Sequence, residues 1–322
     1  MRGSRLVCYV TGDRRGFETR IGSDVFSFFY DHLSRIGKTD AIDLFLYSTG
    51  GVTMAGFALV RLIREFCKKF TVLIPFKAHS CATLIALGAD EVIMGRLGQL
   101  SPVDPSITSP FNPSVPGQGQ QRGLLPVSVE DVVGYLDLAR KEAKVDSESA
   151  LAQIFQQLSS NVHPLALGSV YRAREQIGLL ARTLLSFDMH KTKDKKKIDK
   201  IISILTKERF SHDYIISRRE AKEIIGLKVS ELSDSAEQRL WSLYSTYESA
   251  MELNVPFSNE AFLGTEVRRI GTFDRAFIES TGSTQVFRTQ KEIKKISATQ
   301  PGIPVPVEGY QERVLSEGWV RA

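Results

Sequence analysis

The chain has 322 residues, of which 42% are hydrophobic and 25% are charged, and this is the composition of an ordinary globular protein. It excludes a disordered chain, a collagen-like repeat and a coiled-coil rod. There is no apolar run of roughly 18 residues, so no membrane-spanning helix is expected, and the first residues lack the apolar stretch of a signal peptide. The cysteines, Cys8, Cys67 and Cys81, form no CxxC pair. A reducing, cytoplasmic compartment and no structural zinc are therefore expected.

The charge balance argues against a nucleic-acid partner. The sequence has 42 basic and 37 acidic residues, a net charge of +5, and much of the excess lies in the run 190–197. A nucleic-acid binder would spread basic residues over a face and interleave aromatic ones. We interpret the run as a solvated loop between two helices, with a polyanion contact as the alternative.

The first hundred residues alternate strand-like and helix-like stretches. Apolar runs predict strands, and apolar residues at helical spacing predict helices. The predicted strands cover 5–10, 42–47, 71–76 and 91–94, and the predicted helices cover 24–36, 52–70 and 82–88. This alternation with short connections is typical of a parallel sheet in an α/β protein.

The remainder is predicted to be mostly helical, after an interruption. Residues 105–127 are rich in Pro, Gly, Ser and Gln, and predict an exposed, flexible loop that could serve as a lid or substrate channel. Predicted helices follow at 128 onward, 151–158, 169–185, 198–205, 218–225 and 236–253. Predicted strands at 267–279 and 284–289 complete the chain. We expect one domain over 1–234 and a small C-terminal α+β module over 235–322 that forms an interface.

Two neighbouring strand ends carry the residues of greatest chemical interest. Gly50 and Gly51 follow the strand that ends at Tyr47, and Ser80 follows the next strand. Two glycines at a strand end can simply allow a tight turn, and a serine before a helix is commonly an N-cap. Together, however, they place exposed backbone N–H groups and a hydroxyl at the carboxyl edge of a sheet, where ligands bind in α/β proteins and such donors can stabilise an oxyanion.

Several segments of the sequence resemble the serine dehydrogenase proteinase family. These are YSTGGVTMAGFALVRLIREF, IPFKAHSCATLIALGADEVIM, LSPVDPSI, PVSVEDVVGYLDLAR, VHPLALGSVYR and HDYIISRREAKEIIGLKV, and the similarity extends to RAFIES near the C-terminus. That family is grouped with the signal peptide peptidase A-like proteins in the Clp protease/crotonase superfamily. The resemblance covers roughly residues 5–230 and implies a Clp/crotonase-like ββα spiral core.

The resemblance also implies roles for individual residues. Ser80 falls where Clp-type peptidases carry the nucleophile. Gly51 and Cys81 fall where the two backbone donors of the oxyanion hole lie, and we expect Gly50, Val52 and Thr83 to contact the substrate.

The general base is less obvious. The lysine that related signal peptide peptidases use is missing, because no lysine occurs between Lys77 and Lys141. Our hypothesis pairs Ser80 with His212, with Asp213 or Asp104 orienting the imidazole or shaping the site, because a neutral imidazole can accept the serine proton and return it.

Other residues compete for these roles. Lys77 is a second candidate for the general base, and His212 could equally be a loop or capping histidine. His79 and His163 are interpreted as structural. An Asp between prolines, as at Asp104, commonly forms a turn.

The sequence therefore predicts a serine peptidase or amide hydrolase that acts on polypeptides without a metal or other cofactor. Two alternatives stay open: a catalytically silent scaffold or peptide-binding protein, and a crotonase-type acyl-CoA enzyme that uses the same two N–H donors. The resemblance further implies a homo-oligomer. An unfolding or regulatory partner, if there is one, would be a separate chain.

Overall fold

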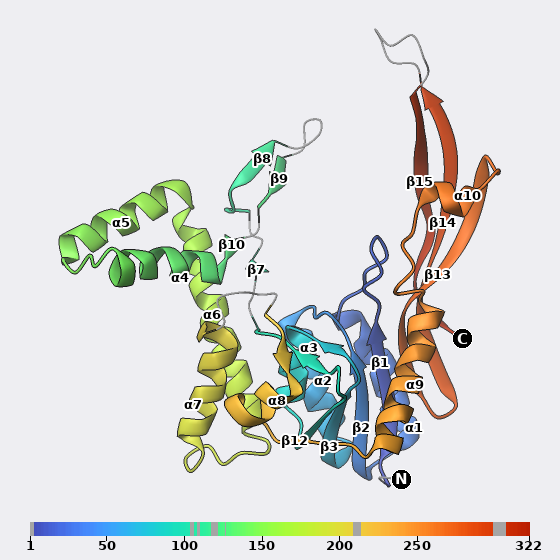
Figure 1. Ribbon diagram of the computed structural model, residues 1–322, viewed down its shortest axis with the longest axis horizontal. Coiled ribbons are helices and arrows are strands. Elements are labelled where there is room, and N and C mark those ends of the chain that lie inside the picture. The colour runs from blue at the N-terminus through green and yellow to red at the C-terminus, as the bar shows by residue number, and fades with distance from the viewer. Residues whose placement is uncertain are drawn as a thin grey trace. The chain divides into compact units, whose positions relative to one another are not determined.

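The computed structural model describes residues 3–103, 106–107, 110–116, 122–125, 127–208, 214–298 and 307–322. Its chain divides into two compact units, one made of Met1–Gln99 with Lys228–Ala322 and the other of Leu100–Leu227 (Figure 1). This division differs from the predicted boundary at residue 234, because the C-terminal strand Arg268–Ser280 pairs with the first strand of the chain and the two strands after it continue the same sheet.

The first unit is built on a mixed sheet. Among the described residues, eight strands pair in the order β12-β5-β3-β2-β1-β13-β14-β15. Pairing is parallel from β12 to β1 and antiparallel from β1 to β15. The strands are β1 (Arg5–Thr11), β2 (Thr39–Tyr47), β3 (Cys67–Ile74), β5 (Glu91–Met94), β12 (Val229–Ser230), β13 (Arg268–Ser280), β14 (Ser283–Ala298) and β15 (Val307–Arg321). The predicted α/β class and its early strands are confirmed, and β15 was not predicted.

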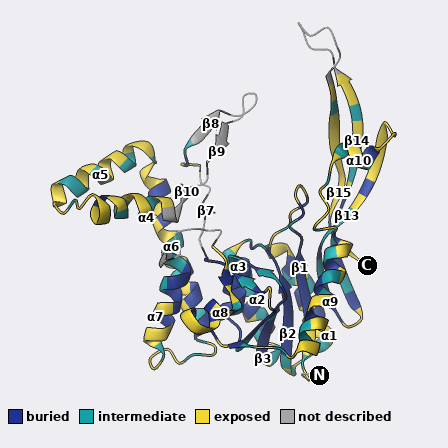
Figure 2. Ribbon diagram, in the orientation of Figure 1, coloured by how far each residue is buried: buried dark blue, intermediate teal, exposed yellow. Residues whose placement is uncertain are grey.

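Helices cover both faces of this sheet, as the alternation of side chains along β1 shows. Tyr9 packs against Phe29 of α1 (Phe26–Ile36), with ring centroids 5.2 Å apart. On the opposite face, Cys8 and Val10 belong to a buried cluster with residues of α9 (Asp234–Ala250). Helices α2 (Thr53–Arg64) and α3 (Cys81–Leu87) contact each other, and α10 (Asn259–Leu263) contacts β13 and β14. Figure 2 shows the buried sheet between exposed helix surfaces.

Helix α2 is shorter than its periodicity predicted. The predicted helix ran to Phe70, but α2 ends at Arg64 and β3 begins at Cys67. The Arg64 guanidinium donates to the Gly88 carbonyl at 2.8 and 3.0 Å, and to Asp90 at 2.9 Å. These contacts fix the end of α2 beside α3, and the following residues pair with β2 instead of continuing the helix.

The second unit is mainly helical. Its described α-helices are α4 (Val129–Asp137), α5 (Glu148–Asn161), α6 (Pro164–Leu185), α7 (Lys195–Ser203) and α8 (Arg218–Glu220). Short π-helical segments follow α4, α7 and α8, at Leu138–Glu142, Ile204–Glu208 and Ala221–Ile225. Where a flexible loop was predicted over 105–127, the described residues form short antiparallel pairs, β7 (Ser106–Ile107) with β10 (Val127–Ser128), and β8 (Ser114–Pro116) with β9 (Arg122–Leu124). The remaining short strands among the described residues are β4 (Lys77–Ala78), β6 (Gln99–Leu100) and β11 (Ile216–Ser217).

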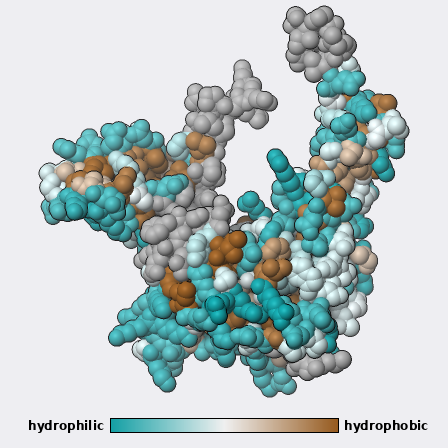
Figure 3. Space-filling model, viewed as in Figure 1, coloured by the Kyte–Doolittle hydropathy of each residue, from teal (hydrophilic) through white to brown (hydrophobic). Residues whose placement is uncertain are grey.

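Apolar side chains are exposed on the α4–α5 part of the second unit. Leu138 and Phe155 are 58% and 53% exposed, and α5 contains no buried residue. Figure 3 shows hydrophobic residues at the surface of this part of the chain. The basic run 190–197 is only partly the solvated loop that was predicted. Residues 191–194 form a turn, but Lys195–Lys197 are the first residues of α7, and they are exposed.

Candidate functional site

Ser80 has an unusual backbone conformation. It lies between β4 and the first residue of α3, with φ +51° and ψ −113°. Such a conformation is rare for a residue with a Cβ and costs about 1–3 kcal/mol, so the surrounding structure must enforce it. Its hydroxyl makes no capping hydrogen bond to α3. Ser80 thus occupies the N-cap position of α3 without capping the helix through its side chain, and its backbone makes a strained turn between strand and helix.

The two glycines lie directly against this serine. Gly50 has φ +112° and Gly51 has φ +153°, so both adopt conformations that favour glycine. A Cβ added to Gly50 would lie 2.8 Å from the Ser80 Cβ and 3.3 Å from its Oγ. A Cβ added to Gly51 would collide with the backbone of Ile21. Both positions therefore require glycine: Gly50 for its backbone angle and its approach to Ser80, and Gly51 for its backbone angle and its approach to Ile21.

Two backbone N–H groups at the site have no acceptor within the described part of the chain. They belong to Gly51 and to Cys81, the first residue of α3. The groups around Gly51 are paired, since the Ile21 N–H donates to the Gly50 carbonyl at 2.9 Å and the Val52 N–H donates to the Ile21 carbonyl at 2.8 Å. Donors of this kind are what a developing oxyanion requires.

The Cys81 side chain is turned away from solvent. Its Sγ is buried and donates to the Val52 carbonyl at 3.2 Å, and Gly56 of α2 leaves room for it. Burial raises the pKa of this thiol to about 12, so it is protonated near neutral pH. The cysteine thus fastens the start of α3 to the start of α2, and only its N–H is available to a ligand.

Ser48 joins the two loops, a role that sequence reasoning missed. Its buried hydroxyl accepts hydrogen bonds from Thr11 Oγ1 at 2.8 Å and from the Gly50 N–H at 3.0 Å. Its N–H donates to the Lys77 carbonyl at 2.9 Å, and its carbonyl accepts from the His79 N–H at 3.0 Å. Ser48 therefore holds the glycine turn beside β4 and Ser80. The available signal was a serine two residues before the glycine pair.

Lys77 is engaged in an ion pair. Its Nζ lies 2.6 Å from Asp13 Oδ2, and the Tyr47 hydroxyl donates to the other oxygen of Asp13 at 2.8 Å. A lysine that acts as a general base must have its amine free to reach the serine hydroxyl, whereas Lys77 Nζ is bound to the Asp13 carboxylate. This contact disfavours Lys77 as the base. Burial raises the pKa of the neighbouring Tyr47 phenol well above its ordinary value, so Tyr47 is a hydrogen-bond donor here.

The other predicted site residues are partly outside the described residues, and the described ones differ in exposure. His212, Asp213 and Asp104 lie outside the described residues, so their roles stay predictions. Thr83 is fully buried in α3 and its hydroxyl donates to the Ala78 carbonyl at 2.8 Å, which does not favour substrate contact. Val52, by contrast, is 56% exposed next to Gly51.

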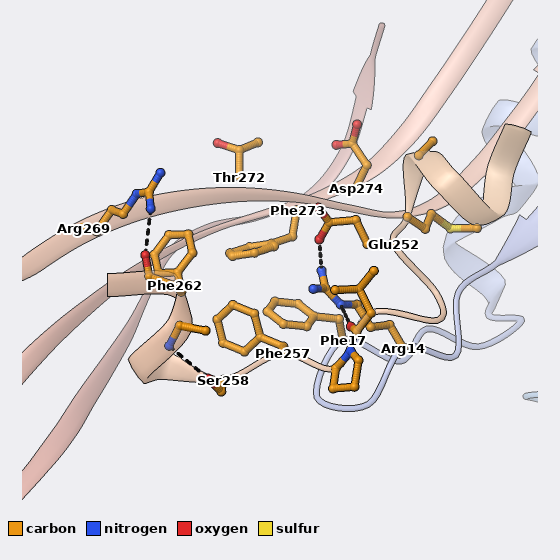
Figure 4. Close-up of a pocket in the computed structure, with 15 residues that line it drawn as sticks. Arg14, Phe17, Glu252, Phe257, Ser258, Phe262, Arg269, Thr272, Phe273 and Asp274 are labelled. Carbon is orange, nitrogen blue, oxygen red and sulfur yellow. Dashed lines mark hydrogen bonds and ion pairs between the residues drawn. The ribbon is translucent and has the colours of Figure 1, made fainter. Parts of the chain in front are cut away.

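A separate cavity of about 490 Å³ lies in the first unit. Four phenylalanines, Arg14 and Arg269 contribute to its lining, and neither Ser80 nor the glycine pair does (Figure 4). In the described residues, no cluster of His, Cys, Asp and Glu is suited to a metal ion, and no helix is both long and apolar enough to cross a bilayer.

Comparisons with known proteins give a family and several relatives. Residues 33–156 match the family described as ClpP-like SDH-type serine proteinase. An uncharacterised protein of Methanocaldococcus jannaschii is 28% identical over 207 residues, which are 64% of this chain and 59% of that protein. A second uncharacterised protein of that organism is 42% identical over 66 residues, 20% of this chain and 23% of its own length. The chain thus matches less than two thirds of either relative.

Two solved structures are also similar. Both are mutants of the 1510-N membrane-bound stomatin-specific protease, one of them in complex with a substrate peptide. They have TM-scores of 0.39, are 13% and 14% identical, cover 68% of this chain, and are themselves covered over 78% and 74% of their length.

Proposed function

We propose that this chain is a serine peptidase or amide hydrolase that cleaves polypeptides, and the match of residues 33–156 to the family described as ClpP-like SDH-type serine proteinase supports the proposal. The observation that carries the proposal is that Ser80, with its strained backbone, lies directly against the glycine turn. A Cβ added to Gly50 would lie only 3.3 Å from the Ser80 Oγ. A Clp/crotonase-type spiral core, a reducing cytoplasmic setting and a homo-oligomeric assembly are proposed with it.

In the proposed reaction, Ser80 Oγ attacks the scissile carbonyl carbon while its proton passes to the general base. The negative charge on the carbonyl oxygen is stabilised by the N–H groups of Gly51 and Cys81, and losing one such donor commonly costs about 10²–10³ in rate. The C–N bond then breaks as the base gives its proton to the leaving amine. An ester to Ser80 remains, and water attacks it by the same path to release the acid.

His212 is proposed as the base, with Asp213 or Asp104 as its orienting carboxylate. Two observations support looking beyond Lys77. The family's aspartate aligns with Asp213, whose neighbour in the sequence is His212. Lys77 Nζ is already paired with Asp13 Oδ2 at 2.6 Å. Imidazole is suited to the role, because its ordinary pKa lies near neutral pH.

A fluorophosphonate probe tests the proposal, since it phosphonylates an activated serine. We expect labelling of the unchanged chain and of Ser235→Ala, an exposed serine on α9, but none of Ser80→Ala. We expect His212→Asn to slow labelling by about 10²–10⁴, and Lys77→Met to leave it near the original rate. The reverse ranking of these two variants would make Lys77 the base.

The other outcomes identify the competing functions. A folded chain that is never labelled and cleaves no fluorescently labelled casein would be a scaffold or peptide-binding protein. Tight binding of coenzyme A, with acyl-CoA turnover retained in Ser80→Ala, would identify a crotonase-type enzyme that uses the same donors without the hydroxyl.

A further inference from the structure

The segment RAFIES (275–280) lies far from Ser80 in sequence, but contacts in the first unit connect its first residue to the glycine turn. We infer that Arg275 is a positioning residue for the Gly51 N–H, and acts through the loop 12–21. This inference rests on the proposed function, because it assigns that N–H to the oxyanion hole.

The first step is the backbone of β13. Its pairing with β14 shifts register between Asp274 and Ala276, so Arg275 occupies a β-bulge. Bulges bend a strand and redirect a side chain. At this bulge the Arg275 carbonyl accepts hydrogen bonds from the Gly12 N–H at 2.8 Å and from Thr19 Oγ1 at 2.8 Å. One carbonyl thus holds both ends of the loop that follows β1.

The second step is the guanidinium group of Arg275, whose side chain is 16% exposed. Nε donates to the Phe17 carbonyl at 3.0 Å and Nη2 donates to the Glu18 carbonyl at 2.5 Å. Nη1 donates to Thr289 Oγ1 at 3.0 Å and to Glu317 at 2.5 Å, which anchors the fork to β14 and β15. A planar fork can make all of these bonds at once, whereas an ammonium group cannot reproduce its geometry.

The same loop is also held from the side of the cavity. The Phe17 ring packs against Phe257 and Phe273, with ring centroids 4.9 and 4.4 Å away. Figure 4 shows these rings together beside Arg14. The Thr19 N–H donates to the Gly12 carbonyl at 2.9 Å and closes the loop on itself. The loop 12–19 is therefore held by Arg275 on one side and by the packing of the Phe17 ring on the other.

The last step links this loop to the glycine turn. Ile21 pairs with Gly51 as in a parallel bridge, through its N–H to the Gly50 carbonyl at 2.9 Å and its carbonyl to the Val52 N–H at 2.8 Å. The Gly51 peptide therefore presents its own N–H on the edge away from Ile21. Residue 19 is only two positions before Ile21 in the chain, so a displacement of residues 17–19 would shift Ile21 and its pairing with Gly51. The Gly51 N–H would then rotate or move.

The test uses Arg275→Ala and Arg275→Lys. The matched control is Arg288→Ala on the adjacent strand, whose guanidinium pairs with Asp274 rather than with the loop. Two quantities are measured: the rate constant and affinity of fluorophosphonate labelling, and hydrogen exchange of peptides covering 16–25 and 48–56. We expect Arg275→Ala to lower the maximal labelling rate by about 10- to 100-fold with little change in affinity, since displacing a catalytic group by about 1 Å can cost 10²-fold.

We also expect faster exchange of the Ile21 and Val52 amides in Arg275→Ala, partial recovery in Arg275→Lys, and no change in Arg288→Ala. Unchanged exchange over 48–56 in Arg275→Ala, or equal effects in Arg288→Ala, would overturn the inference whatever the labelling shows. A wild-type chain that is not labelled would refute the proposed function instead, and the exchange result would still decide whether Arg275 controls the turn.

Discussion

Substituting Ser48 should show how strongly the glycine turn depends on one buried hydroxyl. Ser48→Ala removes the acceptor of two hydrogen bonds, from Thr11 Oγ1 at 2.8 Å and from the Gly50 N–H at 3.0 Å. Both donors are buried, and an unpaired buried donor costs about 1–3 kcal/mol. We therefore expect Ser48→Ala to lower the free energy of unfolding by about 2–4 kcal/mol.

A double-mutant cycle separates this effect from general loss of packing. Thr11→Val alone removes one hydrogen bond and should cost about 0.5–1.5 kcal/mol. In the Thr11→Val background, Ser48→Ala leaves only the Gly50 N–H unpaired. The double variant should therefore lose about 1 kcal/mol less free energy of unfolding than the two single variants lose together. The assay is urea unfolding followed by far-ultraviolet circular dichroism. Strict additivity, or a loss under about 0.5 kcal/mol for Ser48→Ala, would refute the assigned hydrogen bonds.

Three further predictions concern the site and the core. Gly51→Ala should abolish fluorophosphonate labelling and lower the melting temperature, since its Cβ would meet the Ile21 backbone at φ +153°; normal labelling would contradict this. Ser80→Gly should raise the free energy of unfolding by about 1 kcal/mol, because glycine relieves the strain at φ +51°. It should also end labelling, because the hydroxyl is gone. A lower free energy of unfolding would contradict the assigned strain. Burial lowers the pKa of His32, so the unfolded state binds its proton more readily and stability should fall as the pH drops below about 6.5. Part of this slope in a pH series should be missing in His32→Gln, and an identical slope would exclude His32 as its source.

The early strands and helices were predictable because their signals are local. The apolar runs at 42–47 and 91–94, and the helical spacing at 24–36, match β2, β5 and the region of α1 closely. The end of α2 was not, because Phe66 and Phe70 continue its spacing while contacts of Arg64 and pairing with β2 decide where the helix stops. Tertiary contacts of this kind cannot be predicted from the hydrophobic pattern of a short stretch of sequence.

The C-terminal strands show the same limit over a longer range. Residues 235–322 were predicted to form a separate module, yet β13 pairs with β1 and extends the main sheet. β15 is mostly polar and exposed, so its strand character depends on pairing with β14 rather than on alternation of apolar residues.

The candidate site divides in the same way. Ser80, Gly50 and Gly51 could be found from their positions after two consecutive strands. The strain at Ser80, the burial of Thr83 and the role of Ser48 depend on backbone angles and on hydrogen bonds between loops, which the sequence does not display. Arg275 lies more than 190 residues after Ser80, and its connection to the site depends on a bulge in a strand whose pairing is long-range.

The most direct measurement is a crystal structure of the chain after reaction with a phosphonate probe. We predict a covalent bond from phosphorus to Ser80 Oγ, with the phosphoryl oxygen about 2.7–3.1 Å from the backbone nitrogens of both Gly51 and Cys81. An adduct on another residue, or one on Ser80 whose oxygen faces neither nitrogen, would contradict the account.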